Sequence, residues 1–287
     1  MKIAVIGAGW FGCHIAMKLK KYYEVSLFDA NGIFTGASIK NQNRLHLGFH
    51  YARNSSTRSM CENTFQRFRN DYESLLFPVP FNIYAIPKRN SVIDFNTYIK
   101  IFDDYQFDIV GHEYLDNVAG TINVNEKYIN PFSAQFYFIY HLNDIFKLEQ
   151  INNIDDISKE YDLVINCTNN LLNPITTNSF MEPCTIFIYQ KINSTPFDAL
   201  TFVDGPLFSI FPFYENVVTV SDVQYTPDSE LSNADRINKI EEKISYYYSD
   251  FTKNFKYIDY LQAVKAKPVD ISDDRTPVIT VNNNIIN

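Results

Sequence analysis

The beginning of the chain alternates apolar runs with glycines and lysines in a pattern typical of a β-α-β unit. Residues 2–6 read Lys-Ile-Ala-Val-Ile, and this mostly apolar run predicts a buried strand. Residues 10–22 carry apolar side chains at helical spacing and lysines near their end, where a helix C-terminus favours positive charge. Residues 24–29, Glu-Val-Ser-Leu-Phe-Asp, are predicted to form the next strand. We therefore expect two parallel strands joined by a helix.

Farther along, the pattern changes from parallel to antiparallel elements. The predicted elements are helices at 58–76, 92–105, 128–142 and 233–251, and strands at 82–86, 109–114, 120–124, 161–167, 185–191, 207–213 and 217–223. The first of these helices ends before Pro78 and Pro80, which cannot continue it. The strand at 161–167 is continuously apolar, as in the middle of a parallel sheet, so the chain is expected to return to the first sheet there.

Composition and charge exclude several classes of function. The chain has 287 residues and a net charge of −8 without a basic stripe, so we expect no nucleic-acid partner. No stretch is long and apolar enough for a spanning helix, so we expect no membrane partner. The scattered cysteines, without a CxxC pair, predict reduced thiols, no metal site and a cytoplasmic location. The oligomeric state is not determined by these features.

A glycine-rich loop joins the first strand to the first helix. The loop and the acid that closes the second strand comprise Gly7, Ala8, Gly9, Trp10, Phe11, Gly12, Asp29 and Ala30. In such a GxGxxG loop the first glycine permits a tight turn, the second admits a pyrophosphate to the helix N-terminus, and the third allows close packing. Asp29 is suited to bind a ribose diol, which disfavours NADP. The loop therefore predicts a dinucleotide site, without separating FAD from NAD.

The residues after Asp29 favour FAD. An NAD domain continues with regular β-α alternation, whereas this chain enters a polar loop at 35–44 and then an antiparallel region. We predict an α/β fold, α+β overall, with a Rossmann-like FAD/NAD(P)-binding domain and an interleaved antiparallel-sheet substrate domain. The predicted boundaries are 1–77, 126–182 and 265–287 for the nucleotide-binding domain, and 78–125 and 183–264 for the substrate domain.

Residues 36–51 resemble the flavin-contacting segment of the D-amino acid oxidase superfamily. They read Gly-Ala-Ser at 36–38 and Asn-Gln-Asn-Arg-Leu-His-Leu-Gly-Phe-His-Tyr at 41–51. The 2-hydroxyglutarate and glycerol-3-phosphate dehydrogenase-like members in particular have a small-Ser turn followed by Ile/Leu-His-x-Gly-x-x-Tyr. The resemblance implies that Ser38, Asn41, Asn43 and Leu45 contact the cofactor. It also implies that His46 contacts the cofactor close to the reacting centre.

Two later segments are similar to the same family. Residues 161–168 resemble its second FAD strand, and the following turn implies cofactor contacts from Cys167, Thr168 and Asn169. Asn169 replaces a glycine there, and asparagine tolerates a left-handed backbone. Residues 267–279 resemble the family's Arg-Pro…Asp-x-x-Pro-x-Ile run, whose Arg often holds a substrate carboxylate. Lys267 stands in its place, and Arg275 is the nearest guanidinium.

The family continues after this run with a Gly-rich turn and a closing helix, and the sequence ends at Asn287 before either. A natural short form, a truncated form and a variant that uses another element are all compatible with this end. The preceding doublet of Asp273 and Asp274 predicts a turn rather than a pair of catalytic carboxylates.

Four residues are candidates for substrate chemistry. His46 is a candidate general base because histidine titrates near neutrality, and the alternative is a histidine that only packs on the cofactor. Arg44, Arg275 and Lys267 are candidates to hold a carboxylate or phosphate, although most such cations form surface or structural pairs.

The resemblance implies an FAD-dependent oxidoreductase that oxidises a small amine, amino acid or hydroxy compound by hydride transfer to flavin N5. Three alternatives stay open. They are a non-redox flavoenzyme, such as a mutase or lyase acting on a sugar nucleotide, an NAD-dependent dehydrogenase, and a catalytically silent FAD-binding protein. A visible absorption spectrum separates the flavoproteins from the NAD enzyme.

Overall fold

The predicted β-α-β unit is present at the start of the chain. The computed structural model describes residues 1–172, 174, 179–227, 230–269 and 275–287. The unit consists of β1 (Lys2–Ile6), α1 (Trp10–Leu19) and β2 (Glu24–Asp29). Both strands are confirmed and lie parallel. The helix is shorter than the expected 10–22, because the backbone N–H groups of Tyr22 and Tyr23 both turn back to the carbonyl of Leu19.

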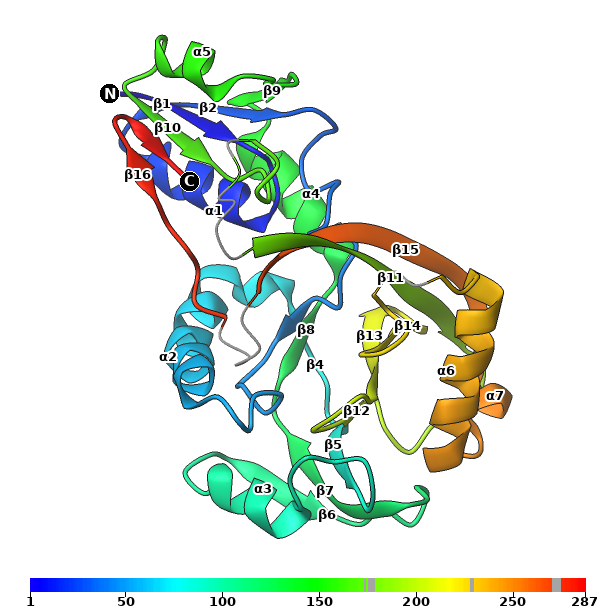
Figure 1. Cartoon of the computed structure of the whole chain (residues 1–287). Coiled ribbons are helices and arrows are strands. Elements are labelled where there is room, and N and C mark those ends of the chain that lie inside the picture. The colour runs from blue at the N-terminus through cyan, green and yellow to red at the C-terminus, as the bar shows by residue number, and fades with distance from the viewer. Residues whose placement is uncertain (173, 175–178, 228–229, 270–274) are drawn as a thin grey trace.

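This unit forms the centre of a six-stranded sheet. The strand order is β16-β17-β10-β1-β2-β9, with β9 at Phe146–Leu148, β10 at Leu163–Asn166, β16 at Val281–Asn282 and β17 at Ile285–Ile286. Strand β10 pairs in parallel with β1, which places the ends of β1 and β10 at the same edge of the sheet. The expected return of the chain to the first sheet is therefore confirmed. Helix α1 packs together with α4 (Pro131–Leu142), and Figure 1 shows both helices below this sheet.

An eight-stranded sheet forms the other large part of the molecule. Its order is β15-β11-β14-β13-β12-β5-β7-β6. The bounds are Asn82–Pro87 for β5, Phe107–Val110 for β6, Val118–Val124 for β7, Ser179–Lys191 for β11, Ala199–Phe202 for β12, Phe208–Tyr214 for β13, Val217–Asp222 for β14 and Phe255–Pro268 for β15. Among the described residues, neighbouring strands of this sheet pair antiparallel except β12 and β5, which are parallel.

A small sheet lies between the two large ones. It has the order β3-β8-β4, formed by Arg44–Leu45, Lys127–Ile129 and Leu76–Pro78. Figure 1 shows β4 and β8 running between the six-stranded sheet above and the eight-stranded sheet below. Residues 44–45 are thereby positioned between the glycine loop and the large antiparallel sheet.

Several predicted elements differ from the structure at their ends. The remaining helices are α2 (Ser55–Tyr72), the 3-10 helix η1 (Glu73–Leu75), α3 (Phe95–Ile101), α5 (Ile154–Ser158), α6 (Asn233–Tyr247) and α7 (Phe251–Asn254). The helix expected at 128–142 begins only at Pro131, because Asn130 caps it and residues 127–129 pair as β8. The strand expected at 109–114 was misplaced, since β6 ends at Val110. The helix expected at 233–251 is divided, because α6 ends at Tyr247.

The apolar cores follow the two large sheets. One cluster packs β1, β2, α1 and α4, and another packs β11 to β14 against α6 (Figure 1). Within the described part of the chain, no helix is both long and apolar enough to cross a membrane. The domain boundaries expected from the sequence stay a prediction.

Candidate functional site

The glycine loop is packed so tightly that it requires glycine. Gly7 has a φ of +96°, and a Cβ at this position would lie 2.5 Å from the carbonyl oxygen of Cys167. A Cβ at Gly12 would lie only 1.8 Å from the carbonyl oxygen of Gly7. The loop therefore presses against both α1 and the end of β10. This close approach leaves the N-terminus of α1 at the edge of the sheet, where the partial positive charge of a helix suits a pyrophosphate.

Asp29 and Ser38 hold this loop from the side. Asp29 accepts hydrogen bonds from the backbone N–H groups of Ala8 at 2.8 Å, Asn31 at 2.8 Å and Gly32 at 3.2 Å. Ser38 Oγ accepts from the backbone N–H of Trp10 at 2.9 Å, in the first turn of α1. The acid and the serine expected to contact a dinucleotide therefore both accept hydrogen bonds from the backbone of the same loop.

The turn after β10 lies beside the glycine loop. The Cys167 N–H donates to the carbonyl of Ile6 at 2.7 Å, and the Thr168 N–H donates to the side chain of Asn166. Asn169 has a φ of 56°, so the left-handed backbone expected from the sequence is confirmed. Its amide donates to the carbonyl of Val264 on β15, which joins this turn to the large antiparallel sheet.

The Arg44 side chain is half-buried among neutral groups. Its Nη1 donates to Thr201 Oγ1 at 2.9 Å, its Nη2 donates to Gln42 Oε1 at 3.1 Å, and its Cζ lies 3.8 Å from the ring centre of Phe211. Gln42 is itself held by Ser209, whose hydroxyl donates to Oε1 at 2.9 Å. Among the described residues, no carboxylate lies within ion-pair distance of Arg44. Burial lowers the pKa of Arg44, although arginine remains charged in proteins.

The two histidines of the segment are held neutral. Burial, and then the charge of Arg44, lower the pKa of His46 to about 4. The same causes lower the pKa of His50 well below its usual range. The expectation that His46 titrates near neutrality is therefore corrected. Its Nδ1 is buried and has no hydrogen-bond partner among the described residues, so this atom is available to a ligand.

Two buried residues beside the histidines were not found from the sequence. Tyr84 on β5 contacts His50 Nδ1 at 2.8 Å through its hydroxyl and donates to Glu126 Oε2 at 2.9 Å. Glu126 also accepts from the backbone N–H of Leu47 at 2.8 Å. A family motif reports only its own segment, and Glu126 lies 79 positions from Leu47. No local signal indicates this acid.

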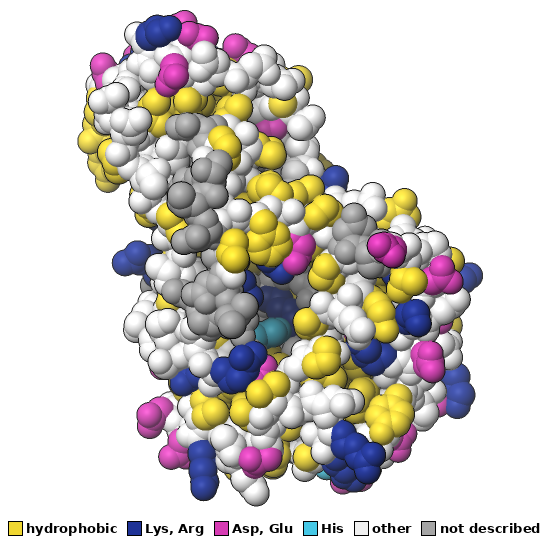
Figure 2. Space-filling model, viewed as in Figure 1, with side chains coloured by type: hydrophobic (Ala, Val, Ile, Leu, Met, Phe, Trp, Pro, Cys, Tyr) yellow, Lys and Arg dark blue, Asp and Glu magenta, His cyan; other side chains and the backbone are white. Residues whose placement is uncertain are grey.

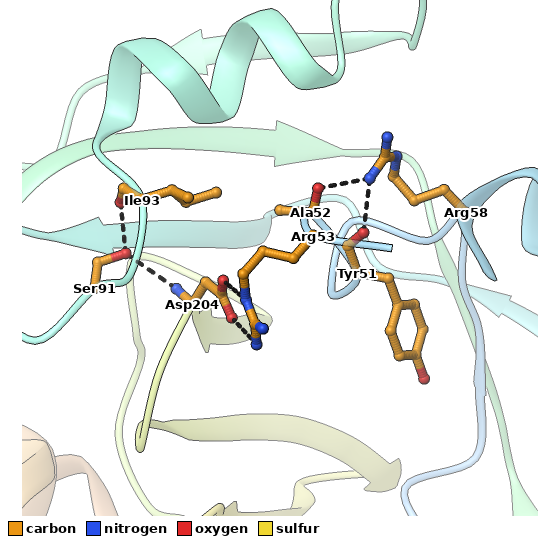
Figure 3. A network of polar contacts seen from close by, with 7 residues as sticks. All are labelled: Tyr51, Ala52, Arg53, Arg58, Ser91, Ile93 and Asp204. Atoms are coloured by element: carbon orange, nitrogen blue, oxygen red, sulfur yellow. Dashed lines mark hydrogen bonds and ion pairs between the residues drawn. The ribbon is translucent and has the colours of Figure 1, made fainter. Parts of the chain in front are cut away.

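An ion pair fixes the turn that follows the histidine segment. Figure 3 shows Arg53 facing Asp204, to which it donates from Nε at 2.5 Å and from Nη2 at 3.2 Å. On the other side of the turn, Arg58 donates to the carbonyls of Tyr51 and Ala52. The segment is therefore tied to both α2 and the loop after β12.

The other candidate cations are placed differently. Arg275 lies with its Cζ 5.9 Å from the ring centre of Tyr51, and the Tyr51 ring in turn lies 5.8 Å from that of His46. The structure thus brings Arg275 toward the histidine segment. Lys267 instead forms an ion pair with Glu182 at 2.5 Å across the antiparallel pair of β11 and β15. The doublet at 273–274 lies outside the described residues.

The remaining expected cofactor contacts surround the same region. Asn43 accepts from the indole N–H of Trp10 at 3.3 Å, and Leu45 is buried beside it on β3. Asn41 is exposed, as are the side chain of Phe11 and Ala30. Figure 2 shows a hollow near the middle of the molecule, in which a histidine and Lys or Arg side chains are visible.

These features fit FAD. The glycine loop and the α1 N-terminus suit the pyrophosphate, Asp29 suits the ribose, and the orphaned Nδ1 of His46 lies in the segment expected beside the flavin. A Cβ at Gly9 would lie 2.8 Å from Ser38 Oγ, so even a methyl group would close the space between them.

Comparisons with known proteins agree with this fit. The family model of FAD dependent oxidoreductases named DAO matches residues 2–85. The chain is 34% identical over 308 residues to the FAD-dependent monooxygenase FPY4 of Fusarium mangiferae, covering 96% of this chain and 82% of that protein.

Solved structures share the fold at low sequence identity. Glycine oxidase from Geobacillus kaustophilus superposes with a TM-score of 0.77 at 11% identity, covering 99% of this chain and 87% of that one. L-proline dehydrogenase from P. horikoshii gives 0.74 at 15% identity, covering 99% and 86%. These structures confirm the expected Rossmann-like fold, and the family model and the Fusarium mangiferae relative confirm the choice of FAD over NAD. The chain belongs to the family of FAD-dependent oxidoreductases of the D-amino acid oxidase type.

Proposed function

We propose that this flavoenzyme oxidises a small amine, amino acid or hydroxy compound that carries a carboxylate or similar anionic group. The observation that carries the proposal is the state of Arg44. Its side chain is half-buried, and in the described part of the chain its guanidinium bonds to neutral acceptors, contacts the ring of Phe211 and has no carboxylate within ion-pair distance. A buried charge is normally paired with an opposite charge, so this arrangement favours an anionic ligand.

The donors of Arg44 suit such an anion. The hydrogen bonds of Arg44 to Thr201 and His50 use Nη1, and the one to Gln42 uses Nη2. None of these three bonds uses Nε or the second hydrogen of Nη2, and the Tyr84 hydroxyl is a further neutral neighbour of the guanidinium. Nε–H and Nη2–H are neighbouring donors that a carboxylate accepts in bidentate fashion. The bonds to Gln42 and Thr201 would hold the guanidinium plane while the anion binds.

His46 is the residue we propose to contact the reacting N–H or O–H of the substrate. Because its pKa is lowered to about 4, the imidazole is neutral at physiological pH and is able to accept a hydrogen bond. An anion bound to Arg44 would offset the charge that lowers this pKa, and His46 would become a stronger base only when substrate is present. FAD, when bound, supplies the acceptor for the hydride at its N5.

The test compares acids with their neutral amides. Turnover of small amino and hydroxy acids, and of the matching amides, is measured for the wild type, Arg44→Met and Arg69→Met. Arg69 is an exposed arginine of α2 and serves as the control. We expect the wild type and Arg69→Met to prefer acids, and Arg44→Met to lose that preference at unchanged FAD content. If Arg44→Met kept the preference of the wild type for acids over amides, the proposed role of Arg44 would be contradicted.

Monooxygenation is a second candidate, favoured by the similarity to the Fusarium mangiferae enzyme along most of both chains. It requires molecular oxygen and an external reductant, whereas the first candidate reduces the flavin with the substrate itself. Consumption of a reduced nicotinamide that depends on substrate would favour the second.

A cytoplasmic location and the lack of a nucleic-acid partner remain predictions from the cysteines and the net charge.

A further inference from the structure

A continuous chain of side-chain hydrogen bonds leads from Arg44 to a fully buried carboxylate. Arg44 Nη1 contacts His50 Nε2 at 3.4 Å, His50 Nδ1 contacts the Tyr84 hydroxyl at 2.8 Å, and that hydroxyl contacts Glu126 Oε2 at 2.9 Å. Tyr84 and Glu126 are both 0% exposed. This chain of hydrogen bonds runs from the histidine segment, residues 44–50, to β5 and then to the loop between β7 and β8.

The direction of each hydrogen bond in this chain is determined by its ends. Arginine only donates, so His50 Nε2 must be the bare, accepting nitrogen, and the proton of the neutral ring must lie on Nδ1. Nδ1–H then donates to Tyr84, whose own proton is left to donate to Glu126. At the far end, the Leu47 backbone N–H is a fixed donor to Glu126 Oε1.

Glu126 accepts every hydrogen bond that reaches it. Besides Tyr84 and Leu47, the amide of Asn82 donates to Oε2 at 3.2 Å. Among the described residues no cation lies within ion-pair distance of Glu126. Burial raises the pKa of Glu126 and the charge of Arg44 opposes that rise, so the two charged groups interact at a distance, through His50 and Tyr84, and each lacks an opposite charge in direct contact.

We propose that Glu126 is a positioning residue and the remote counter-ion of Arg44. Through Tyr84 it fixes the His50 tautomer whose Nε2 holds Arg44, and it leaves the free donors of Arg44 open to an anion. A carboxylate in direct contact with Arg44 would occupy those donors. The identity of the anion rests on the proposed function, whereas the tautomer does not.

Glu126→Gln should reverse the direction of the hydrogen bonds that join His50, Tyr84 and residue 126. The Leu47 N–H cannot change from donor to acceptor, so the glutamine oxygen must face it and the glutamine NH₂ must face Tyr84. Tyr84 then accepts from Gln and donates to His50 Nδ1, which moves the ring proton to Nε2. That proton points at Arg44 Nη1, and the contact becomes one donor against another.

Nitrogen NMR of histidine-labelled, FAD-loaded protein measures the tautomer directly. We expect His50 to carry its proton on Nδ1 in the wild type and in Glu126→Asp, and on Nε2 in Glu126→Gln. A wild-type proton on Nε2, or an unchanged tautomer in Glu126→Gln, would overturn the proposal. Tyr84→Phe provides a second test that keeps the charge of Glu126 and removes only one oxygen atom.

This second test measures binding of acetate and of neutral acetamide by the change in the flavin spectrum. Tyr84→Phe should weaken acetate binding by about tenfold, the effect of one hydrogen bond, without changing acetamide binding. The control is Tyr98→Phe, since Tyr98 is equally buried but donates to the carbonyl of Phe49. Equal acetate affinities in Tyr84→Phe and Tyr98→Phe would overturn the proposal that Glu126 acts on Arg44 through Tyr84 and His50. A wild type that does not prefer acetate would instead contradict the proposed function. The His50 tautomer would still test whether Glu126 acts through Tyr84 and His50.

Discussion

Replacing Gly12 by alanine should force the glycine loop away from α1. The new Cβ would lie 1.8 Å from the carbonyl oxygen of Gly7, whereas real Cβ contacts are essentially never shorter than 3.0 Å. The carbonyl belongs to the backbone and the backbone also fixes the position of a Cβ, so no side-chain rotation relieves the clash. The Gly7 N–H is also held by the carbonyl of Phe28 at 2.7 Å, and a shift of the loop therefore disturbs the end of β2.

The expected loss of stability follows from two opposing contributions. Overpacking of a well-packed site costs about 1–3 kcal/mol, and a clash between backbone atoms belongs at the upper end. Alanine is a better helix former than glycine by about 1 kcal/mol, and Gly12 lies in the first turns of α1. The net loss is therefore about 2 kcal/mol, which lowers the melting temperature of a chain of this size by about 3–4 °C.

The assay is thermal unfolding of purified Gly12→Ala with and without added FAD, together with its FAD content. We expect a lower melting temperature and a lower FAD content, because the pyrophosphate binds where the loop is displaced. Gly36→Ala is the matched control, since a Cβ there has no atom within 4 Å. Equal melting temperatures and FAD contents in the two variants would refute the packing argument.

Three further predictions concern stability. The His46 pKa of about 4 lies below its unfolded value of 6.5, so the unfolded apoprotein binds more protons than the folded one between these pH values. The free energy of unfolding, measured with urea at a series of pH values, should therefore fall on acidification by up to about 3 kcal/mol. His46→Gln should make this free energy less dependent on pH. Asp204→Asn should lower stability in urea by about 1 kcal/mol through the loss of its partly exposed pair with Arg53, and an unchanged midpoint would exclude a stabilising pair. Asn169→Ala should be less stable than Asn169→Gly by about 1 kcal/mol in urea, because its φ is positive, and the reverse order would contradict this conformation.

The sequence was sufficient to predict the nucleotide-binding part of the molecule. Strand, glycine loop, helix and acid are local in the chain, and each has a distinct residue pattern. The left-handed backbone at Asn169 was also predictable, because few residue types tolerate it. The ends of several helices and strands were less well predicted. The start of α4 was placed too early, although Asn130 and Pro131 are a recognisable cap and first residue.

The candidate site was only partly predictable, because its buried polar groups come from distant segments. Tyr84 and Glu126 are 42 positions apart, and nothing in their local sequences distinguishes them from ordinary strand and loop residues. The pKa of His46 depends on burial and on Arg44, so its residue type alone indicated a titration range that the fold changes. Lys267 was matched by position to a substrate-binding arginine, but its partner Glu182 lies on the neighbouring strand.

The most direct test of the proposed function is a single anaerobic titration of the purified flavoprotein. A small amino or hydroxy acid is added without any nicotinamide, and the visible absorption band of the oxidised flavin is recorded. The account predicts that the acid alone bleaches this band and that the matching amide does not. A band that persists with every acid, and is lost only when a reduced nicotinamide is added, would contradict direct oxidation of a carboxylate-bearing substrate.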